Sequence, residues 1–275
     1  MMQGPNHTPS SLPDALLAKL VTELDDNTVR AIILHGSYAR GDAIPPYSDI
    51  DLVRILQETR KKNEQKRFTY YDNYLIGISS RPLSVYRERF MMPEKAIFVV
   101  PGIREAHILL EKDGEFSVLQ QEAQAWRWEP LQAEADAYAS HLMMEQSEIV
   151  LKLLRALVLH DPVALSDMLL DLFSAVTEAI AVQRGVLVLS GNTYFHQVQE
   201  AIGLDSMWTH YHLLTVGIVT QAIPVPSIEA RGIAVLHLYQ ETAQLLQSCV
   251  SSEHWKMIEQ TIDMIKHTLP HEKFS

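Results

Sequence analysis

The chain has 275 residues, 47% of them hydrophobic and 21% charged, with a formal net charge of -11. This length predicts two domains, and the negative charge argues against a long nucleic acid as partner, because phosphate binding needs a basic face. The single Cys249 excludes an intrachain disulfide, and no run of about 20 apolar residues could span a membrane. We therefore expect a cytoplasmic protein without a membrane partner, whose residues 1–10 form a disordered leader.

The chain up to about residue 128 shows the pattern of an α/β region. A helix is expected from Ser11 onward, because leucines recur on one face and Pro13 fits its first turn. Short apolar or alternating runs predict four strands. Pro82 starts a short helix after the third strand, and helical spacing predicts another helix after the fourth. The strands are expected at 29–36, 49–56, 68–79 and 105–114, and the two helices at 82–90 and 115–126.

From about Trp128 onward, long helical spacing replaces the strand pattern. Asp161-Pro162 ends the first long helix, as a proline does beyond a helix end. The helices are expected at 131–160, 163–183, 195–202, 208–220, 227–249 and 253–268. The sequence thus predicts an α+β fold with two domains, residues 1–128 and an all-helical domain of residues 129–275.

The most informative stretch is HGSYARGDAIPPYSDIDLVRI, His35 to Ile55. Asp49 and Asp51 are two positions apart on an expected strand, so their side chains share a face, about 7 Å apart. Two such carboxylates repel each other unless a divalent cation lies between them. Since Mg²⁺ prefers one or two protein carboxylates together with phosphate oxygens, the pair predicts a site for a metal-bound nucleoside triphosphate.

The Gly-Ser turn that precedes this pair offers groups suited to phosphate. Gly36 permits close approach of the backbone, and Ser37 offers a hydroxyl and an N–H group. If a helix begins here, its free N–H groups face the anion, and Arg40 adds a positive charge. A P-loop is excluded, because Gly41 is followed by an aspartate and not by lysine.

The combined pattern HGS…R…PYSDID resembles the signature of the nucleotidyltransferase superfamily that includes DNA polymerase β. It is especially similar to the kanamycin nucleotidyltransferase group. The resemblance implies a small mixed β-sheet flanked by helices, then a helical domain that closes over the acceptor. It also implies a homodimer and the Mg²⁺-dependent transfer of a nucleoside monophosphate from ATP or another NTP to a hydroxyl group. The acceptor would be a small hydroxylated molecule, with an aminoglycoside as one candidate.

The resemblance also implies roles for individual residues. The aspartates would hold the metal ions, the Gly-Ser turn the terminal phosphates, and the arginine would balance phosphate charge. A serine beside the first aspartate would assist by hydrogen bonding. In this chain these residues are Asp49, Asp51, Gly36, Ser37, Arg40 and Ser48.

The chain departs from the superfamily pattern at the third carboxylate, which the resemblance places on a later strand. Direct alignment puts Tyr74 or Leu75 at that position. Asp72 is the only carboxylate in the segment and stands two or three residues early, so it would join the metal site only through a bulge in the strand.

The resemblance also implies a general base on the first long helix of the second domain. Glu148, or alternatively Glu145, matches that position, although either fits an exposed helix carboxylate as well.

Two alternatives to a small-molecule enzyme remain open. The missing carboxylate favours an inactive nucleotide-binding or regulatory member, and a protein hydroxyl could replace the small acceptor. Two further groups of residues are weaker candidates for ligand sites. The charged run Arg60–Arg67 fits a solvated connection better than an anion site. His210-Tyr211-His212 lacks the accompanying spacing of a zinc site.

Overall fold

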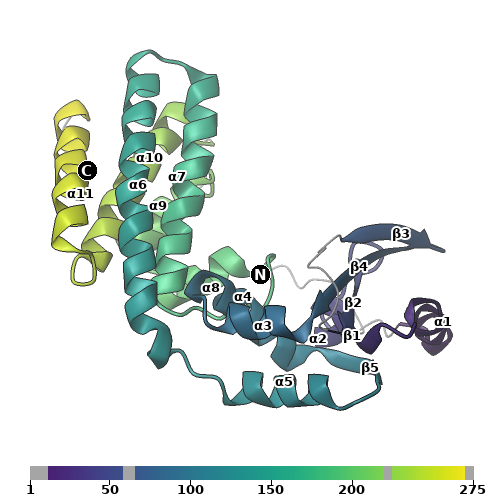
Figure 1. Cartoon of the computed structure of the whole chain (residues 1–275). Helices are drawn as coiled ribbons and strands as arrows, with labels where there is room; N and C mark the ends of the chain where they lie inside the picture. Colours follow the sequence, from purple (N-terminus) through teal and green to yellow (C-terminus); the bar gives the residue numbers. More distant parts are fainter. Residues whose placement is uncertain (1–11, 58–65, 220–224, 270–275) are drawn as a thin grey trace. The chain divides into compact units, whose positions relative to one another are not determined.

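The computed structural model describes residues 12–57, 66–219 and 225–269. The chain divides into two compact units (Figure 1). The first unit contains Met1–Arg127 together with Leu187–Gly191, and the second contains Trp128–Val186 and Asn192–Ser275. The expected leader lies outside the described residues.

The first unit is built on a five-stranded mixed β-sheet, which confirms the expected fold class. The strand order is β3-β4-β2-β1-β5; β2 and β4 are parallel and the other neighbours are antiparallel. The strands are β1 (Val29–His35), β2 (Ile50–Leu56), β3 (Arg67–Tyr71), β4 (Tyr74–Pro82) and β5 (His107–Glu111). The helices of this unit are α1 (Asp14–Leu24), α2 (Gly36–Arg40), α3 (Leu83–Phe90), α4 (Pro93–Glu105) and α5 (Glu115–Ala125).

Two elements of this unit differ from the prediction. The single strand expected at 68–79 is a hairpin of β3 and β4, because Asp72 turns the chain with a φ of 51°. Two-residue hairpin turns require such left-handed residues, and aspartate and asparagine tolerate them. Helix α4 was not predicted, because Pro101 and Gly102 interrupt its helical pattern.

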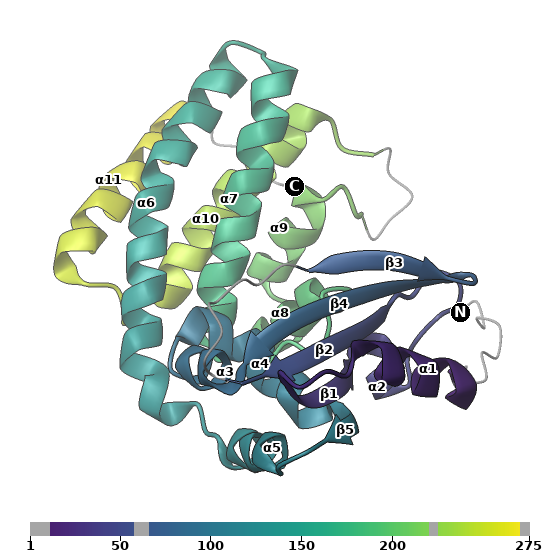
Figure 2. The same ribbon diagram turned by 45° about the vertical axis from the view of Figure 1, so that its right-hand side comes forward.

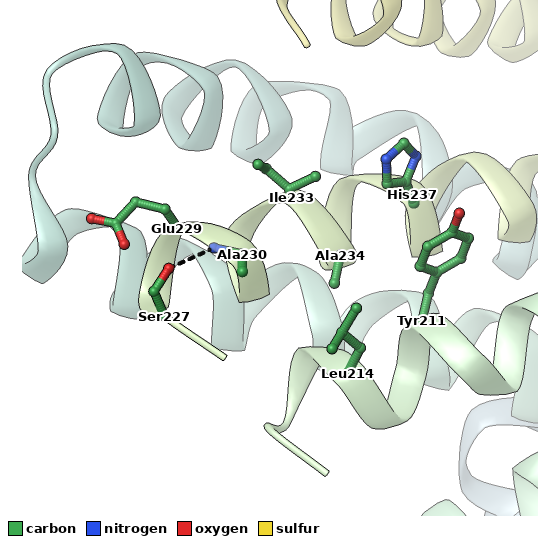
Figure 3. A pocket seen from close by; sticks show the side chains of 8 residues that line it. All are labelled: Tyr211, Leu214, Ser227, Glu229, Ala230, Ile233, Ala234 and His237. Carbon is green, nitrogen blue, oxygen red and sulfur yellow. Dashed lines mark hydrogen bonds between the residues drawn. The ribbon is translucent and has the colours of Figure 1, made fainter. Parts of the chain in front are cut away.

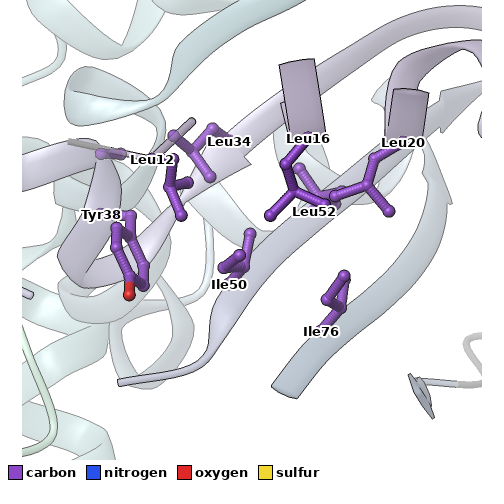
Figure 4. Close-up of a cluster of buried hydrophobic side chains, with 9 residues drawn as sticks. Leu12, Leu16, Leu20, Leu34, Tyr38, Ile50, Leu52 and Ile76 are labelled. Atoms are coloured by element: carbon purple, nitrogen blue, oxygen red, sulfur yellow. The ribbon is translucent and has the colours of Figure 1, made fainter. Parts of the chain in front are cut away.

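Helix α1 covers one face of the sheet, as Figure 4 shows. Its Leu16 and Leu20 pack in one buried cluster with Ile50, Leu52 and Ile76 of β2 and β4. Since side chains alternate along a strand, burial of residues 50 and 52 directs residue 51 to the opposite face. The core on one face of the sheet therefore positions Asp51 on the other.

The second unit consists of helices, among which α6 and α7 lie side by side (Figures 1 and 2). The Asp161 side chain caps α7 by accepting the N–H groups of Val163 and Ala164, both at 3.1 Å. None of the helices in the described ranges is long and apolar enough to cross a membrane. The helices are η1 (Glu129–Leu131, a 3-10 turn), α6 (Gln132–Val158), α7 (Pro162–Gln183), α8 (Tyr194–Ile202), α9 (Met207–Thr215), α10 (Ile228–Leu246) and α11 (Ser252–Thr268).

Candidate active site

Asp49 and Asp51 converge on a single positive charge. Asp51 is the second residue of β2, and Asp49 directly precedes the strand. The Nζ atom of Lys66 lies 2.9 Å from Oδ1 of Asp51 and 4.0 Å from Oδ2 of Asp49. The two carboxylates keep 28% and 38% of their side-chain surface exposed. The pair therefore faces solvent on one side of the sheet and shares one cation between its members.

Gly36 lies against the Asp51 carboxylate. Strand β1 ends at His35, which is the register partner of Asp51, and α2 begins at the next residue. Gly36 has a φ of 73°, and a Cβ atom added there would lie 2.9 Å from Oδ2 of Asp51. Glycine is needed here for both reasons, because other residues rarely adopt this φ and their Cβ would displace the carboxylate.

The two other residues expected to bind phosphate lie on α2. Ser37 is in its first turn, and the Ser37 carbonyl accepts the N–H groups of Gly41 and Asp42. The guanidinium of Arg40 pairs with Asp42 at 3.2 Å, and its Nε lies 3.9 Å from Oε2 of Glu105. Arg40 is thus already shared between two carboxylates, so a phosphate group would have to compete with them for it.

Ser48 shapes the loop that leads into Asp49. Its Oγ accepts the N–H of Ile44 at 2.8 Å, while the Ile44 carbonyl accepts the N–H groups of Tyr47 and Ser48. These bonds close a turn directly before the first aspartate. The Ser48 side chain therefore bonds to the backbone of its own loop.

The structure does not bring Asp72 to the pair, because β4 pairs with β2 and β3 without the bulge that this would require. Asp72 lies in the β3–β4 turn, whereas the register partner of Asp51 on β4 is Gly77, five residues further along. At about 3.3 Å per residue, this separation is about 16 Å. Within the described residues, no group of three or more His, Cys, Asp or Glu side chains could hold a metal ion.

The candidate general bases lie on α6, in the helical unit. Glu148 is 74% exposed and pairs with Lys152 at 2.7 Å. A hydrogen bond from Lys152, reinforced by its charge, lowers the pKa of Glu148 below the ordinary value, which makes it a weaker proton acceptor. Glu145 lies 3.2 Å from the ring of His141 on the same helix. The assignment of a general base stays a prediction.

Four residues that sequence reasoning did not assign also belong to this site. Lys66 balances the aspartates, and Gly77 leaves space for the lysine side chain. A Cβ atom at Gly102 of α4 would lie 2.3 Å from Nε2 of His35, so α4 packs its backbone against that ring. Burial lowers the pKa of His35, although the nearby Asp51 carboxylate acts in the opposite direction. His35 therefore packs against α4 as a neutral ring.

The paired carboxylates fit one divalent cation. Oδ1 of Asp51 and Oδ2 of Asp49 approach the Lys66 ammonium, and the second oxygen atom of each carboxylate can serve a metal ion; that of Asp51 lies beside Gly36. Carboxylate oxygens are the protein ligands that Mg²⁺ prefers, and it usually keeps water or phosphate oxygens as further ligands. The donor set thus suits Mg²⁺ that arrives with a triphosphate.

The helical unit contains a cavity of about 300 Å³ between α9 and α10, shown in Figure 3. Its walls are largely apolar and include Leu214, Ile233 and Ala234. The rings of Tyr211 and His237 stack beside it with centroids 4.9 Å apart. One carboxylate, Glu229, lies at this cavity. Its lining lacks a second acidic side chain, so it does not offer the paired carboxylates found at β2.

His212, in the stretch His210-Tyr211-His212, is a buried core residue whose two ring nitrogens are both hydrogen-bonded. Its Nδ1 lies 2.9 Å from the Gln199 amide nitrogen, and its Nε2 lies 3.2 Å from the Thr177 hydroxyl. That hydroxyl donates to the Phe173 carbonyl, so it accepts from Nε2–H and leaves Nδ1 as an acceptor. The neutral ring stacks on Trp208 with centroids 4.7 Å apart. Burial lowers the pKa of His212 to about 4.

We expect His212 to make the unfolding free energy depend on pH. Between pH 6.5 and about 5, the unfolded chain binds a proton at this residue and the folded chain does not. The unfolding free energy should therefore fall by about 2 kcal/mol as the pH decreases over this interval. Urea unfolding of the wild type and of His212→Gln across the interval measures this difference in slope. Equal slopes in the two proteins would contradict the expectation.

Comparison with known proteins supports the resemblance seen in the sequence. Residues 17–104, from α1 into α4, match the family described as nucleotidyltransferase domain. The matched segment contains Gly36, Ser37, Asp49 and Asp51. It supports the superfamily and nucleotidyl transfer in general, while the kanamycin nucleotidyltransferase group stays a prediction.

Two further comparisons add no functional information. Comparison with curated proteins finds no match. Among solved structures, a nucleotidyltransferase-like protein from Exiguobacterium sibiricum 255-15 is similar to this chain with a TM-score of 0.46 and 10% identity. That similarity covers 86% of this chain and 76% of the other, and at this level it carries no argument about function.

Proposed function

We propose that this chain is a metal-dependent nucleotidyltransferase that moves a nucleoside monophosphate from ATP or another NTP to a hydroxyl group of a small molecule. The observation that supports it most strongly is the pairing of Asp49 and Asp51 with one cation, the Lys66 ammonium, at a site where the Asp51 carboxylate also lies beside Gly36. This geometry falls within the segment that matches the nucleotidyltransferase domain.

The reaction assigns a task to each part of the site. The acceptor oxygen forms a bond to the α-phosphorus, the bond from that phosphorus to the bridging oxygen breaks, and pyrophosphate leaves. Asp49 and Asp51 would hold Mg²⁺, which when bound neutralises charge on the triphosphate. The Ser37 hydroxyl would donate to a terminal phosphate oxygen. Arg40 would approach the phosphates at the expense of its pair with Asp42. The proton of the acceptor hydroxyl would pass to a base, for which Glu148 and Glu145 stay the candidates.

Nucleotide transfer can be tested with labelled ATP and Mg²⁺. We expect pyrophosphate release in the presence of a panel of small hydroxylated acceptors that includes aminoglycosides, and a label that becomes attached to one of them. The cationic aminoglycosides would suit a chain with a net charge of -11. Omission of Mg²⁺ serves as the control. Release that continues without a divalent ion would argue against the proposed chemistry.

The main alternative is a nucleotide-binding protein without turnover. Its support is the missing third acid: the residue of β4 opposite Asp51 is Gly77, which has no side chain. Calorimetry that detects ATP binding, with no transfer to any acceptor, would favour this function.

A related alternative is transfer to a protein hydroxyl, which mass spectrometry of co-purified proteins would detect as a nucleotide adduct. The expected homodimer and cytoplasmic location are kept as predictions.

A further inference from the structure

We propose that Lys66 takes the place of the second metal ion and the third carboxylate, so that the site works with one divalent cation. This inference rests on the proposed function, since it concerns how the same site balances the charge of a nucleotide. Lys66 would act as a positioning residue. In the superfamily pattern, the third carboxylate and the second metal ion take this role.

Three contacts hold the Lys66 side chain at the paired aspartates. Its Nζ lies 2.9 Å from Oδ1 of Asp51 and 4.0 Å from Oδ2 of Asp49. The same atom lies 4.8 Å from the centre of the Phe68 ring, within the range of a cation–π contact. Phe68 is the register partner of Gly77, which is in turn the register partner of Asp51. The Lys66 side chain therefore contacts a set of residues that pair with one another across β3, β4 and β2, namely Phe68, Gly77 and Asp51.

Gly77 makes room for this lysine. A Cβ atom added at Gly77 would lie 2.7 Å from Cε of Lys66 and 3.0 Å from Oδ1 of Asp51. An acid at this position of β4 would meet both the lysine stem and the neighbouring carboxylate. Lys66 can therefore lie over β4 at this point because Gly77 has no side chain.

Replacement of the third carboxylate and the second metal ion by Lys66 leaves the net charge of the site unchanged. Two carboxylates, one ammonium and one divalent ion carry a net charge of one positive unit. Three carboxylates with two divalent ions carry the same net charge. A triphosphate would therefore meet the same net charge with fewer ions, whereas a second divalent ion beside the ammonium would add two positive units.

The experiment counts bound Mn²⁺ by electron paramagnetic resonance and measures its affinity by calorimetry, with and without α,β-methylene-ATP. We expect one Mn²⁺ per nucleotide-bound chain in the wild type. Lys66→Gln should bind that ion about tenfold more tightly in the absence of nucleotide, because a repelling charge has been removed. The double variant Lys66→Ala/Gly77→Asp should bind two.

Lys19→Gln is the matched control. Lys19 also lies over an aromatic ring of β3, 4.5 Å from the centre of Tyr71, but it does not pair with the aspartates. Its substitution should leave both the number of bound ions and their affinity unchanged. Thermal unfolding shows whether each variant is folded. If the double variant is not folded, the Mn²⁺ affinity of Lys66→Gln decides whether the inference holds.

Two results would overturn the inference while leaving the proposed function intact. One is a wild type that binds two Mn²⁺ ions with nucleotide, and the other is a Lys66→Gln variant whose affinity equals that of Lys19→Gln. A chain that binds no Mn²⁺ in any variant, with or without nucleotide, would overturn the proposed function as well.

Discussion

Replacement of Asp51 by asparagine is expected to lower the rate of nucleotidyl transfer by about 1000-fold while the protein stays folded. The substitution keeps the shape of the side chain but removes a charge that the metal and its triphosphate require. A loss of about 4 kcal/mol in transition-state stabilisation corresponds to this change in rate. The Asp51–Lys66 pair is partly exposed, so its loss should lower the unfolding free energy by about 1 kcal/mol or less.

The measurement combines the initial rate of pyrophosphate release with a thermal unfolding scan. Asp72→Asn is the matched control, because it removes a carboxylate from the same sheet at the β3–β4 turn. Asparagine tolerates the left-handed conformation found there, so this variant should keep both its rate and its stability. An Asp51→Asn protein that retains more than about a tenth of the rate would place the catalytic metal elsewhere.

Substitution of Gly36 by alanine should reduce both activity and stability, whereas substitution of Gly41 should reduce stability alone. The two glycines are the first residue of the short helix α2 and the residue directly after it, and they have similar left-handed conformations, with φ of 73° and 79°. Each alanine should therefore lower the unfolding free energy by about 1–2 kcal/mol. The new Cβ differs in its surroundings: at Gly36 it would lie 2.9 Å from Oδ2 of Asp51, and at Gly41 nothing lies within 4 Å.

The expected result for Gly36→Ala is a loss of about 100-fold in rate, because displacement of a catalytic group by about 1 Å has effects of this size. Gly41→Ala should keep nearly the full rate once both proteins are assayed well below their unfolding temperatures. Urea unfolding gives the two stabilities, and pyrophosphate release gives the two rates. Equal rates in the two variants would show that the contact between Gly36 and Asp51 has no part in the reaction.

The elements that sequence reasoning predicted correctly are those with a local signature. The apolar run ending at His35 and the alternation after Asp49 specify β1 and β2 within one residue of their observed bounds. The helical half was equally accessible, since the Asp161 cap and the proline after it separate α6 from α7. The hairpin was missed, although Asp72-Asn73 carries a turn signal that the surrounding aromatic residues concealed.

The features that the sequence could not reveal depend on register between strands. Lys66 belongs to a charged run that fits a solvated connection, and only the pairing of β3 with β4 brings it over Gly77. The position of the expected third acid likewise depends on which residue of β4 faces Asp51. Direct alignment points to Tyr74 or Leu75, whereas the parallel register places Gly77 opposite Asp51. Such long-range pairings are set by packing across the whole sheet and not by any single segment.

The assignment of Leu187–Gly191 to the first unit has a consequence for how the protein is made. Val188 is buried, and its N–H donates to the Ile97 carbonyl of α4 at 2.7 Å. Almost sixty residues of helix and connection separate this segment from Arg127, so a ribosome must translate α6 and α7 before the sheet-bearing unit receives its last piece. The two units are therefore interleaved in the order of synthesis, and a nascent chain released at Arg127 would leave α4 without the segment that bonds to its Ile97 carbonyl.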